Sequence, residues 1–317
     1  MQKEELENLI QKHRDLYRSG NAEISDEAYD TLVEDLRKID PNNSLINTVE
    51  EEKFDLPTIR HPFPMLSTQK AYSIDELRKF FNRIEKKYGK LTYRITPKLD
   101  GLGAMYQRDK DKLVTRGDGA IGYDVTDAFD KGLRIVNDKE LYNDTNYLGE
   151  IVMNQEYFNY YLSDNYNHPR NVVVGGVKSD ELSELQRQSF KDGAVMFVPY
   201  SELNYCILNS DEILSGLDKI IEVLSDCPFP IDGYVIDIVD GDIRHELGHT
   251  SHHYRWQIAY KQQTEKKKTT VLDVTWQTGR GGNITPVLEI EPVNVSGATV
   301  RRVTAHNYGF LQEKGID

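Results

Sequence analysis

The pattern of apolar positions in the first 40 residues predicts two helices. Apolar side chains recur at helical spacing over residues 6–17, Gly20 interrupts the pattern, and a second apolar stripe covers residues 29–36. Ser25 precedes this second stripe and is a suitable N-cap for the helix. We therefore expect a small two-helix module, followed by a polar linker over about residues 41–60.

Downstream of residue 90 the pattern changes to the alternation that is typical of β-strands. Six strands are expected in the middle of the chain, at residues 91–96, 102–107, 112–115, 147–153, 193–200 and 231–239. Helices are expected at about residues 74–88, 155–163 and 210–225. Because these strands and helices do not alternate strictly, the pattern indicates an α+β fold built on antiparallel sheets.

The C-terminal part of the chain is almost entirely β in pattern. Strands are expected at residues 270–277, 284–290 and 298–304, joined by Gly-rich turns. Three strands with open edges make part of a barrel rather than a stable domain of their own.

Composition narrows the class of protein. The 317 residues suffice for about two average domains, and 38% hydrophobic with 29% charged residues is an ordinary globular composition. No apolar run reaches the length of a membrane span and the N-terminus has no apolar signal core, so we expect no membrane partner and a cytoplasmic location. The chain has only two cysteines, Cys206 and Cys227, which excludes a disulfide scaffold and a zinc site of four thiolates.

The charge distribution bears on nucleic-acid binding. A formal charge of −13 argues against a protein that coats nucleic acid by general attraction. Residues 255–305 differ from this average, with eight Lys and Arg against four Asp and Glu. A phosphate backbone could bind there, although a solvated lysine-rich loop at residues 264–270 explains the pattern equally well.

One of two short motifs suggests a zinc site. Residues 245–249 (His-Glu-Leu-Gly-His) match the H-E-x-x-H pattern of zinc proteases, in which both histidines lie on one helical face. A match of this length arises by chance in about one chain in 25 of this size. Gly248 weakens the helix, and neither His252 nor His253 has the spacing of a third ligand in known zincins. Surface histidines are therefore the favoured interpretation.

The other motif, Lys98-x-Asp100-Gly101, is a lysine nucleophile pattern of equal rarity. Lys98 and Asp100 are two residues apart at a strand end, so both are expected on one face, and Gly101 would let a ligand approach the backbone. An uncharged amine can attack a phosphoryl or carbonyl centre, but a neighbouring carboxylate raises the pKa of a lysine. Asp100 is therefore expected to orient the amine or a sugar hydroxyl rather than to activate the amine. Taken alone, a surface Lys–Asp pair in a turn explains the motif better.

Further motifs in the same order resemble those of the NAD-dependent DNA ligases, and the resemblance is collinear from about residue 5 to 308. The segment around Lys98 looks like the adenylated-lysine motif of that family. The matches downstream are residues 115–119 (Thr-Arg-Gly-Asp-Gly), 149–153 (Gly-Glu-Ile-Val-Met), 168–171 (His-Pro-Arg-Asn), 231–233 (Ile-Asp-Gly) and 255–261 (Arg-Trp-Gln-Ile-Ala-Tyr-Lys). The zinc-protease string falls in the ordinary stretch before the last of these motifs, which removes most of its support.

The resemblance implies three parts. Residues 1–60 resemble the helical module, with its linker, that binds the nicotinamide mononucleotide (NMN) half of NAD. Residues 61–265 resemble a nucleotidyltransferase domain with ATP-grasp-like antiparallel sheets. Residues 266–317 resemble an incomplete oligonucleotide-binding (OB) fold.

The resemblance also implies a reaction. Lys98 would attack the α-phosphorus of NAD, release NMN and carry AMP, with Mg²⁺ as a cofactor. AMP would pass to the 5′-phosphate of nicked duplex DNA, and a 3′-hydroxyl would then displace it. Each step is an in-line displacement at phosphorus, in which positioning and charge neutralisation dominate.

Roles for single residues follow from the same resemblance. The expected catalytic residues are Lys98, Asp100 and Lys261, of which Lys261 would neutralise the α-phosphate. The residues expected to bind the dinucleotide are Tyr17, Asp26, Tyr29, Asp30, Ser67, Arg116, Glu150, Arg170, Tyr200 and Lys261. The carboxylates expected to hold Mg²⁺ are Glu150 and Asp232.

Two of these assignments have structural alternatives. Tyr200 is expected to stack on adenine, but it could also be a core aromatic at a strand end. Tyr29 also fits the apolar stripe of its helix, so a structural role stays open for the residues of the helical module.

Three positions depart from the family pattern. Asp237 stands where the fourth motif normally has lysine, Thr96 replaces an acidic residue two positions before the nucleophile, and Lys178 replaces an arginine. A carboxylate at position 237 should be costly near phosphates, unless it points elsewhere or another basic residue compensates. Reduced activity or an altered substrate is therefore expected.

The zinc-binding, helix–hairpin–helix and C-terminal domains of the family are missing from this sequence. We therefore expect self-adenylation but poor nick sealing. The chain is either an excised piece of a longer ligase or one subunit of a split ligase that resembles those of some bacteriophages. In the favoured split hypothesis, a second subunit completes the open barrel edge. The alternative from another class is a degenerate homologue that binds NAD without chemistry, and a metalloprotease is a distant third.

Overall fold

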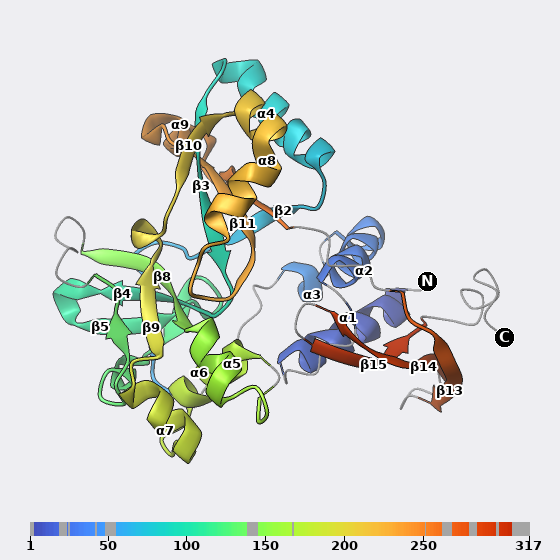
Figure 1. Ribbon diagram of the computed structural model, residues 1–317. Coiled ribbons are helices and arrows are strands. Elements are labelled where there is room, and N and C mark those ends of the chain that lie inside the picture. The colour runs from blue at the N-terminus through green and yellow to red at the C-terminus, as the bar shows by residue number, and fades with distance from the viewer. Residues whose placement is uncertain are drawn as a thin grey trace. The chain divides into compact units, whose positions relative to one another are not determined.

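The computed structural model describes residues 3–18, 24, 26–41, 43–47, 55–137, 145–166, 168–250, 252–261, 268–278, 284–295 and 298–305. The chain divides into two units, residues 47–262 and residues 1–46 with 263–317 (Figure 1). The described parts combine helices with largely antiparallel sheets, which confirms the predicted α+β class.

Two five-stranded sheets form the framework of residues 47–262. The first has the order β10-β3-β11-β12-β2, built from β2 (Ser67–Ala71), β3 (Thr92–Leu99), β10 (Cys206–Asn209), β11 (Ile231–Ile238) and β12 (His253–Tyr260). The second has the order β5-β4-β8-β9-β7, built from β4 (Leu102–Gln107), β5 (Lys112–Thr115), β7 (Arg134–Ile135), β8 (Asn146–Met153) and β9 (Val195–Pro199). Only β12–β2 and β7–β9 pair in parallel among these strands. A separate two-stranded sheet pairs β1 (Thr58–Arg60) antiparallel with β6 (Ile121–Tyr123).

The first sheet is apolar on one face and polar on the other. Helices α4 (Ile74–Tyr88) and α8 (Ser210–Leu224) pack with the apolar face, to which β3 contributes Tyr93 and Ile95. Because side chains alternate along a strand, Arg94, Thr96 and Lys98 of β3 lie on the opposite face. The nucleophile motif is therefore on the side of the sheet that these helices leave free.

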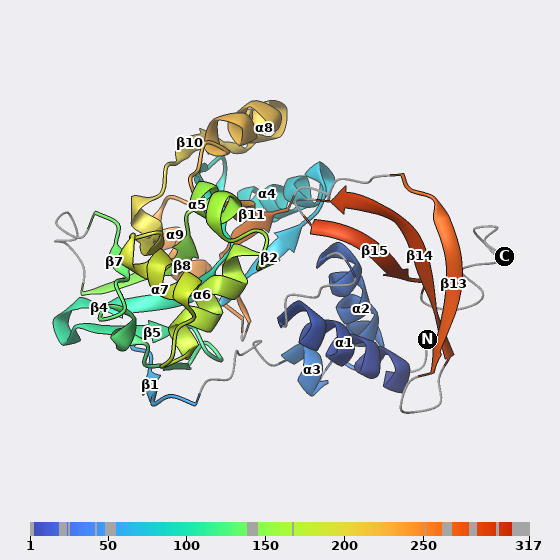
Figure 2. The same cartoon turned by 60° about the horizontal axis from the view of Figure 1, so that its bottom comes forward.

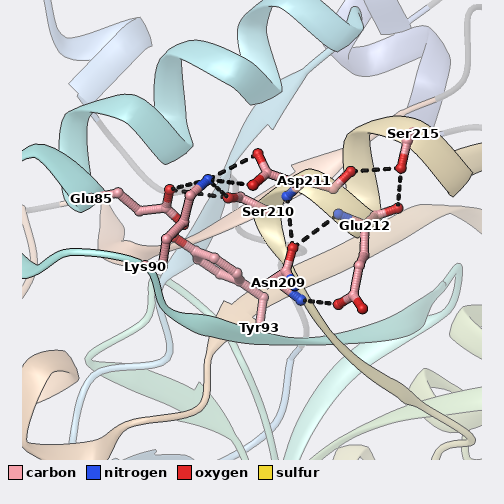
Figure 3. Close-up of polar contacts among 8 residues, drawn as sticks. All are labelled: Glu85, Lys90, Tyr93, Asn209, Ser210, Asp211, Glu212 and Ser215. Atoms are coloured by element: carbon pink, nitrogen blue, oxygen red, sulfur yellow. Dashed lines mark hydrogen bonds and ion pairs between the residues drawn. The ribbon is translucent and has the colours of Figure 1, made fainter.

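A polar network joins the end of α4 to the start of α8 (Figure 3). Lys90 Nζ lies 2.8 Å from Asp211 Oδ2 and 3.3 Å from Glu85 Oε2, and Ser210 Oγ donates to the same Glu85 oxygen at 3.0 Å. Tyr93 OH donates to Glu85 Oε1 at 3.2 Å. Asn209 and Glu212 form a capping box at the first turn of α8. The network holds both helices on the face away from Lys98.

The second sheet shares its apolar core with three helices (Figure 2), which are α5 (Gln155–Tyr161), α6 (Pro169–Lys178) and α7 (Glu184–Lys191). Apolar residues of α6, among them Val172 and Val173, enter the same core as Ile151 of β8. The C-terminal end of α6 is capped by Lys131, whose Nζ donates to the carbonyls of Gly176, Val177 and Ser179 at 2.9–3.2 Å. This cap fixes the helix whose first turn carries Arg170.

Gly101, between β3 and β4, is required by strand packing. A Cβ atom at this position would lie 2.2 Å from the carbonyl oxygen of Ile151 and 2.7 Å from Cγ1 of Val152. The backbone of β8 fills the space of a side chain here, and the expected approach of a ligand to this glycine stays a prediction.

The remaining described elements agree in part with the sequence predictions. Helices α1 (Lys3–Arg18) and α2 (Asp26–Ile39) confirm the two-helix module, and Leu6, Ile10 and Leu36 form its core. The predicted linker over residues 41–60 instead contains α3 (Ser44–Asn47) and β1. The C-terminal strands β13 (Val271–Thr278), β14 (Ile284–Val295) and β15 (Ala298–Thr304) form the predicted antiparallel sheet.

Several described elements had no expectation in the sequence pattern. They are α6, α7, the short helix α9 (Gly241–Leu247), and strands β2, β6, β7, β10 and β12. The described residues also contain the single-turn 3₁₀ helices η1 (Arg108–Lys110), η2 (Thr126–Ala128) and η4 (Tyr200–Glu202). Within the residues that the structure describes, no helix is long and apolar enough to cross a bilayer.

The surroundings of two glycines, one in the second sheet and one on α8, predict opposite effects of their substitution. In Gly149→Ala the new Cβ would lie 2.4 Å from Val198 O and 2.7 Å from Cζ of Phe197, so we expect a loss of about 2 kcal/mol or more in the free energy of unfolding. In Gly216→Ala on α8 nothing lies within 4 Å of the new Cβ, and we expect a gain of about 0.5–1 kcal/mol. Urea denaturation followed by circular dichroism measures both, and equal stabilities of the two variants would contradict the described packing.

Candidate active site

One carboxylate joins the two lysines on the free face of the first sheet. Lys98 Nζ lies 2.8 Å from Oδ1 and 3.1 Å from Oδ2 of Asp232, and Lys261 Nζ lies 3.0 Å from Oδ2. Strand register explains this convergence, because Lys98 pairs with Gly233 across β3 and β11, and Lys261 follows directly after β12. The side chain of Lys261 is 8% exposed, so its charge is largely withdrawn from solvent.

The protonation of Asp232 limits what it can do. Burial alone would raise its pKa, but the charges of Lys98 and Lys261 and their hydrogen bonds outweigh burial and lower the pKa to about 2. A carboxylate this acidic is a poor base at neutral pH, so it orients the two ammonium groups instead of accepting their protons. Asp232, which the resemblance assigned to Mg²⁺, is thus the carboxylate that contacts the candidate nucleophile.

Asp100 has other partners. Its Oδ2 lies 3.6 Å from His168 Nε2, and its Oδ1 lies 3.8 Å from Nη1 of Arg170. The chain turns after Leu99, the last residue of β3, so Asp100 does not continue the line of the strand. Asp100 therefore contacts the start of α6 and not the Lys98 amine, and its expected role toward a sugar hydroxyl stays a prediction.

His168 is a site residue that the residue assignments missed. Its Nδ1 accepts a hydrogen bond from the backbone N–H of Arg170 at 3.2 Å, which makes it the N-cap of α6. This bond leaves Nε2 as the nitrogen that faces Asp100. The N-cap position directly before Pro169 was the signal in the sequence that could have found it.

Glu150 is another carboxylate in this region, and it contacts Tyr200. The Tyr200 hydroxyl donates a hydrogen bond to Oε2 of Glu150. Burial raises the pKa of Glu150, although Tyr200, Lys98, Arg170 and Arg116 oppose this change. Burial of the hydroxyl and the negative charge of Glu150 raise the pKa of Tyr200 well above its usual value. Tyr200 remains 38% exposed and belongs to none of the described apolar clusters, which disfavours the core-aromatic alternative.

Arg116 is placed by the tight turn that follows β5. Its backbone N–H donates to Gly103 O at 2.7 Å, and its carbonyl lies 3.1 Å from His61 Nε2. Its Nη1 donates to Ser67 Oγ at 3.5 Å. Gly117 has a φ of 57° in this turn, a conformation that favours glycine. The structure thus brings Ser67 to Arg116, as two of the predicted dinucleotide-binding residues.

Seven predicted site residues therefore interact in one region through Lys98, Asp232 and Glu150, and the seventh is Tyr200, which donates to Glu150. Lys98 and Lys261 contact Asp232, while Arg116, Arg170 and Lys98 act electrostatically on Glu150. Besides Lys98, the region contains the cations of Lys261, Arg116 and Arg170, which suit phosphate oxygens. It also contains the partly exposed ring of Tyr200.

The residues predicted to bind NMN lie in the other unit. Tyr29 is half-buried in α2, packs against the apolar core of that module, and accepts a hydrogen bond from Arg14 Nε at 3.2 Å. The backbones of Tyr17, Asp26 and Asp30 belong to α1 and α2, and their side chains lie outside the described residues. Their expected role stays a prediction.

The geometry excludes the zinc-protease hypothesis. Helix α9 ends at Leu247, so His249 is not on the helix that carries His245. Glu246 forms an ion pair with Lys87 at 2.5 Å. No group of three or more His, Cys, Asp or Glu side chains that could hold a metal occurs among the described residues, which include all of these histidines.

The structure thus places a lysine amine at a strand end, in contact with one carboxylate and near further basic side chains, an arrangement that suits phosphoryl transfer. Comparison with family models agrees. Residues 53–192 and 186–265 match the NAD-dependent DNA ligase adenylation domain, and residues 268–317 match the NAD-dependent DNA ligase OB-fold domain. The chain belongs to the NAD-dependent DNA ligase family.

Relatives named DNA ligase support this assignment. The protein from Desulfatibacillum aliphaticivorans is 45% identical over 317 residues, which cover 98% of this chain and 49% of the relative. That from Desulfotalea psychrophila is 38% identical, covering 98% and 47%, and that from Psychromonas ingrahamii is 37% identical, covering 95% and 47%. The chain thus spans about half the length of these relatives.

The lowered pKa of Asp232 predicts a pH-dependent contribution to stability. Because the folded-state pKa is depressed, the contribution is present above the unfolded value of 3.8 and is lost as the pH falls toward 2. The shift corresponds to about 2 kcal/mol at neutral pH. We expect Asp232→Asn to unfold more easily than wild type at about pH 6, and this difference to shrink by about half at about pH 3 and further as the pH falls toward 2.

Urea denaturation of both proteins across this pH range measures the difference. The matched control is Asp75→Asn, which removes an exposed carboxylate whose partner is Arg78 on the same helix. A stability difference for Asp232→Asn that does not change with pH would contradict the proposed ion pairs.

Proposed function

We propose that this chain performs the adenylation step of an NAD-dependent DNA ligase. Lys98 first loses a proton to water, and its neutral amine then attacks the α-phosphorus of NAD. A P–N bond forms, the P–O bond to NMN breaks, NMN leaves with the electron pair, and the attacking nitrogen releases its second proton to water. The product is a lysine–AMP phosphoramidate. The observation that carries the proposal is the alignment of Lys98 and Lys261 on the two oxygens of Asp232, in a chain that matches the adenylation domain of this family.

The basic residues around Lys98 suit the charge that develops in this step. Lys261 is held near the amine and would neutralise an α-phosphate oxygen. Arg116 and Arg170 offer planar guanidinium groups for further phosphate or sugar oxygens, and the Ser67 hydroxyl supports Arg116. As AMP arrives, the amine exchanges its ion pair with Asp232 for the covalent bond, so Asp232 would remain paired with Lys261.

Glu150 and Tyr200 are assigned to the nucleoside. Glu150 would accept a hydrogen bond from a ribose hydroxyl, and the exposed ring of Tyr200 would stack on adenine. Asp100 would act with His168 and Arg170 to position the start of α6. Tyr17, Asp26, Tyr29 and Asp30 of the helical module are proposed to hold the NMN half of NAD.

The proposed Mg²⁺ ligands, Glu150 and Asp232, fit an ion only in part. Both Asp232 oxygens contact ammonium groups and one Glu150 oxygen accepts from Tyr200. Mg²⁺ commonly takes one or two carboxylates, with substrate phosphates and water as the other ligands. Glu150 is the better candidate, and an ion there would add charge neutralisation to the attacked phosphate.

The later steps belong to the same proposal. AMP would pass from Lys98 to the 5′-phosphate of nicked duplex DNA, and the 3′-hydroxyl would displace it to seal the strand. A role in DNA replication and repair, and a cytoplasmic location, follow from this activity. A second ligase subunit, as in a split bacteriophage enzyme, stays a prediction of the sequence analysis. The alternative function is an NAD-binding homologue without chemistry, which Thr96 and Asp237 motivated.

Intact mass after incubation with NAD and Mg²⁺ tests the adenylation step. We expect a mass gain of one AMP in the wild-type chain, no gain with ATP in place of NAD, and no gain in Lys98→Ala. Lys261→Ala should slow the gain by at least about 100-fold, because the phosphate charge then lacks its buried partner. Lys90→Ala is the matched control, since Lys90 lies in the network on the other face of the sheet and should leave the rate unchanged. No adduct in the wild-type chain would favour the binding alternative.

Nick sealing tests the later steps. We expect this chain alone to seal nicked duplex DNA poorly, and to seal it once a polypeptide with the remaining ligase domains is added. A gel assay with a 5′-labelled nicked duplex measures the product. Efficient sealing by this chain alone would contradict the need for a second subunit.

A further inference from the structure

Asp237 departs from the family pattern, and its surroundings account for the change of charge. Its side chain is buried, with 10% exposure, and Oδ2 lies 3.3 Å from Nη2 of Arg244 on α9. Across the sheet it pairs in register with Arg94 of β3 and with Gln257 of β12. Asp237 therefore pairs with one guanidinium group and is acted on electrostatically by a second, and these two arginines supply the compensating basic charge.

The two arginines need a carboxylate between them. Burial lowers the pKa of Arg244, and the positive charge of Arg94 lowers it further, whereas Asp237 opposes both effects. Burial raises the pKa of Asp237 itself, against the charges of Arg244 and then Arg94. A lysine at position 237 would place a third cation in this cluster, so the family residue does not fit these neighbours.

Arg94 connects this cluster to the nucleotide-binding ring proposed above. Its Nη2 donates to the carbonyl of Tyr200 at 2.9 Å, and its guanidinium carbon lies 4.9 Å from the centre of the Tyr205 ring. Both ends of the segment 200–205 are thus attached to one side chain. The Tyr200 hydroxyl at the start of this segment donates to Glu150, so the segment reaches across to the second sheet.

Arg94 has few other fixed contacts. Its Nε is buried without a hydrogen-bond partner among the described residues. Arg94 and Asp237 pair in register across β3 and β11, on the same side of the sheet as Lys98, so the negative charge of Asp237 acts on this guanidinium.

We propose that Asp237 and Arg94 are positioning residues that hold the segment 200–205, and through it the ring of Tyr200, in place for the nucleotide. Arg244 forms the ion pair with Asp237 and links this carboxylate to α9. This inference rests on the proposed function for the identity of the nucleotide, but the link from Asp237 to the segment 200–205 is a property of the protein alone.

Two readouts test the proposal in the full chain. The first is amide hydrogen exchange of residues 198–204, which needs no substrate. The second is the separation of KM for NAD from kcat in lysine adenylation. We expect Asp237→Asn to accelerate exchange in this segment at least about tenfold, and to raise KM about tenfold with kcat changed less than about threefold. Asp237→Glu should restore most of both values, because it keeps the charge.

Further variants remove the simple alternatives. Arg94→Gln should reproduce both effects, and it decides the question if Asp237→Asn does not fold. Asp237→Lys, which restores the family residue, should be worse than Asp237→Asn in both readouts. Glu246→Gln is the matched control, because it removes an exposed carboxylate next to α9 residue Arg244 and should leave both readouts unchanged.

The outcomes separate this inference from the proposed function. Unchanged exchange and unchanged KM in folded Asp237→Asn, or wild-type behaviour of Asp237→Lys, would overturn the positioning role. If the wild-type chain forms no adduct with NAD, the proposed function fails, while the exchange measurement still decides whether Asp237 holds the segment 200–205.

Discussion

The site depends on one carboxylate that serves two ammonium groups. Lys98 Nζ lies 2.8 and 3.1 Å from the two oxygens of Asp232, and Lys261 Nζ lies 3.0 Å from Oδ2. Bringing two cations this close without a carboxylate between them would be unfavourable in a partly buried site. The same carboxylate therefore allows the nucleophile and the phosphate-binding cation to lie side by side before any nucleotide arrives.

Strand pairing places these groups with little freedom. Lys98 and Asp232 lie at paired ends of β3 and β11, and Lys261 follows β12 on the next strand of the sheet. A shift of one residue in either pairing would move a lysine to the apolar face that α4 and α8 cover. The polar network of Lys90 and Glu85 joins the helices on that far face, and the absence of a side chain at Gly101 lets β8 approach the end of β3.

The sequence predicted the parts of this structure that depend on periodicity or on local motifs. The limits of α4 and α8, the strands at the nucleophile and the residues of the family motifs required only neighbours along the chain. The partner of the amine was not predictable in this way, because the choice between Asp100 and Asp232 depends on how β3 turns after Leu99 and pairs with β11. Short elements such as α9 and the edge strand β10 were missed because tertiary packing, and not periodicity, determines them.

Asp237 shows the same limit most clearly. As a departure from a motif it suggested a loss of activity, because it exchanges a cation for an anion near the expected phosphates. Its register opposite Arg94 on β3 changes the interpretation, because the carboxylate then completes a local charge balance on the site face of the sheet. A substitution that is unfavourable in the family pattern is thus consistent with this chain's own neighbours.

The structure of the chain after reaction with NAD tests the central claim most directly. The account predicts AMP joined through phosphorus to Nζ of Lys98, an α-phosphate oxygen within hydrogen-bond distance of Lys261, and Asp232 still paired with Lys261. Nucleotide attached to another residue, or an unmodified Lys98 still paired with Asp232 while AMP lies elsewhere, would contradict it.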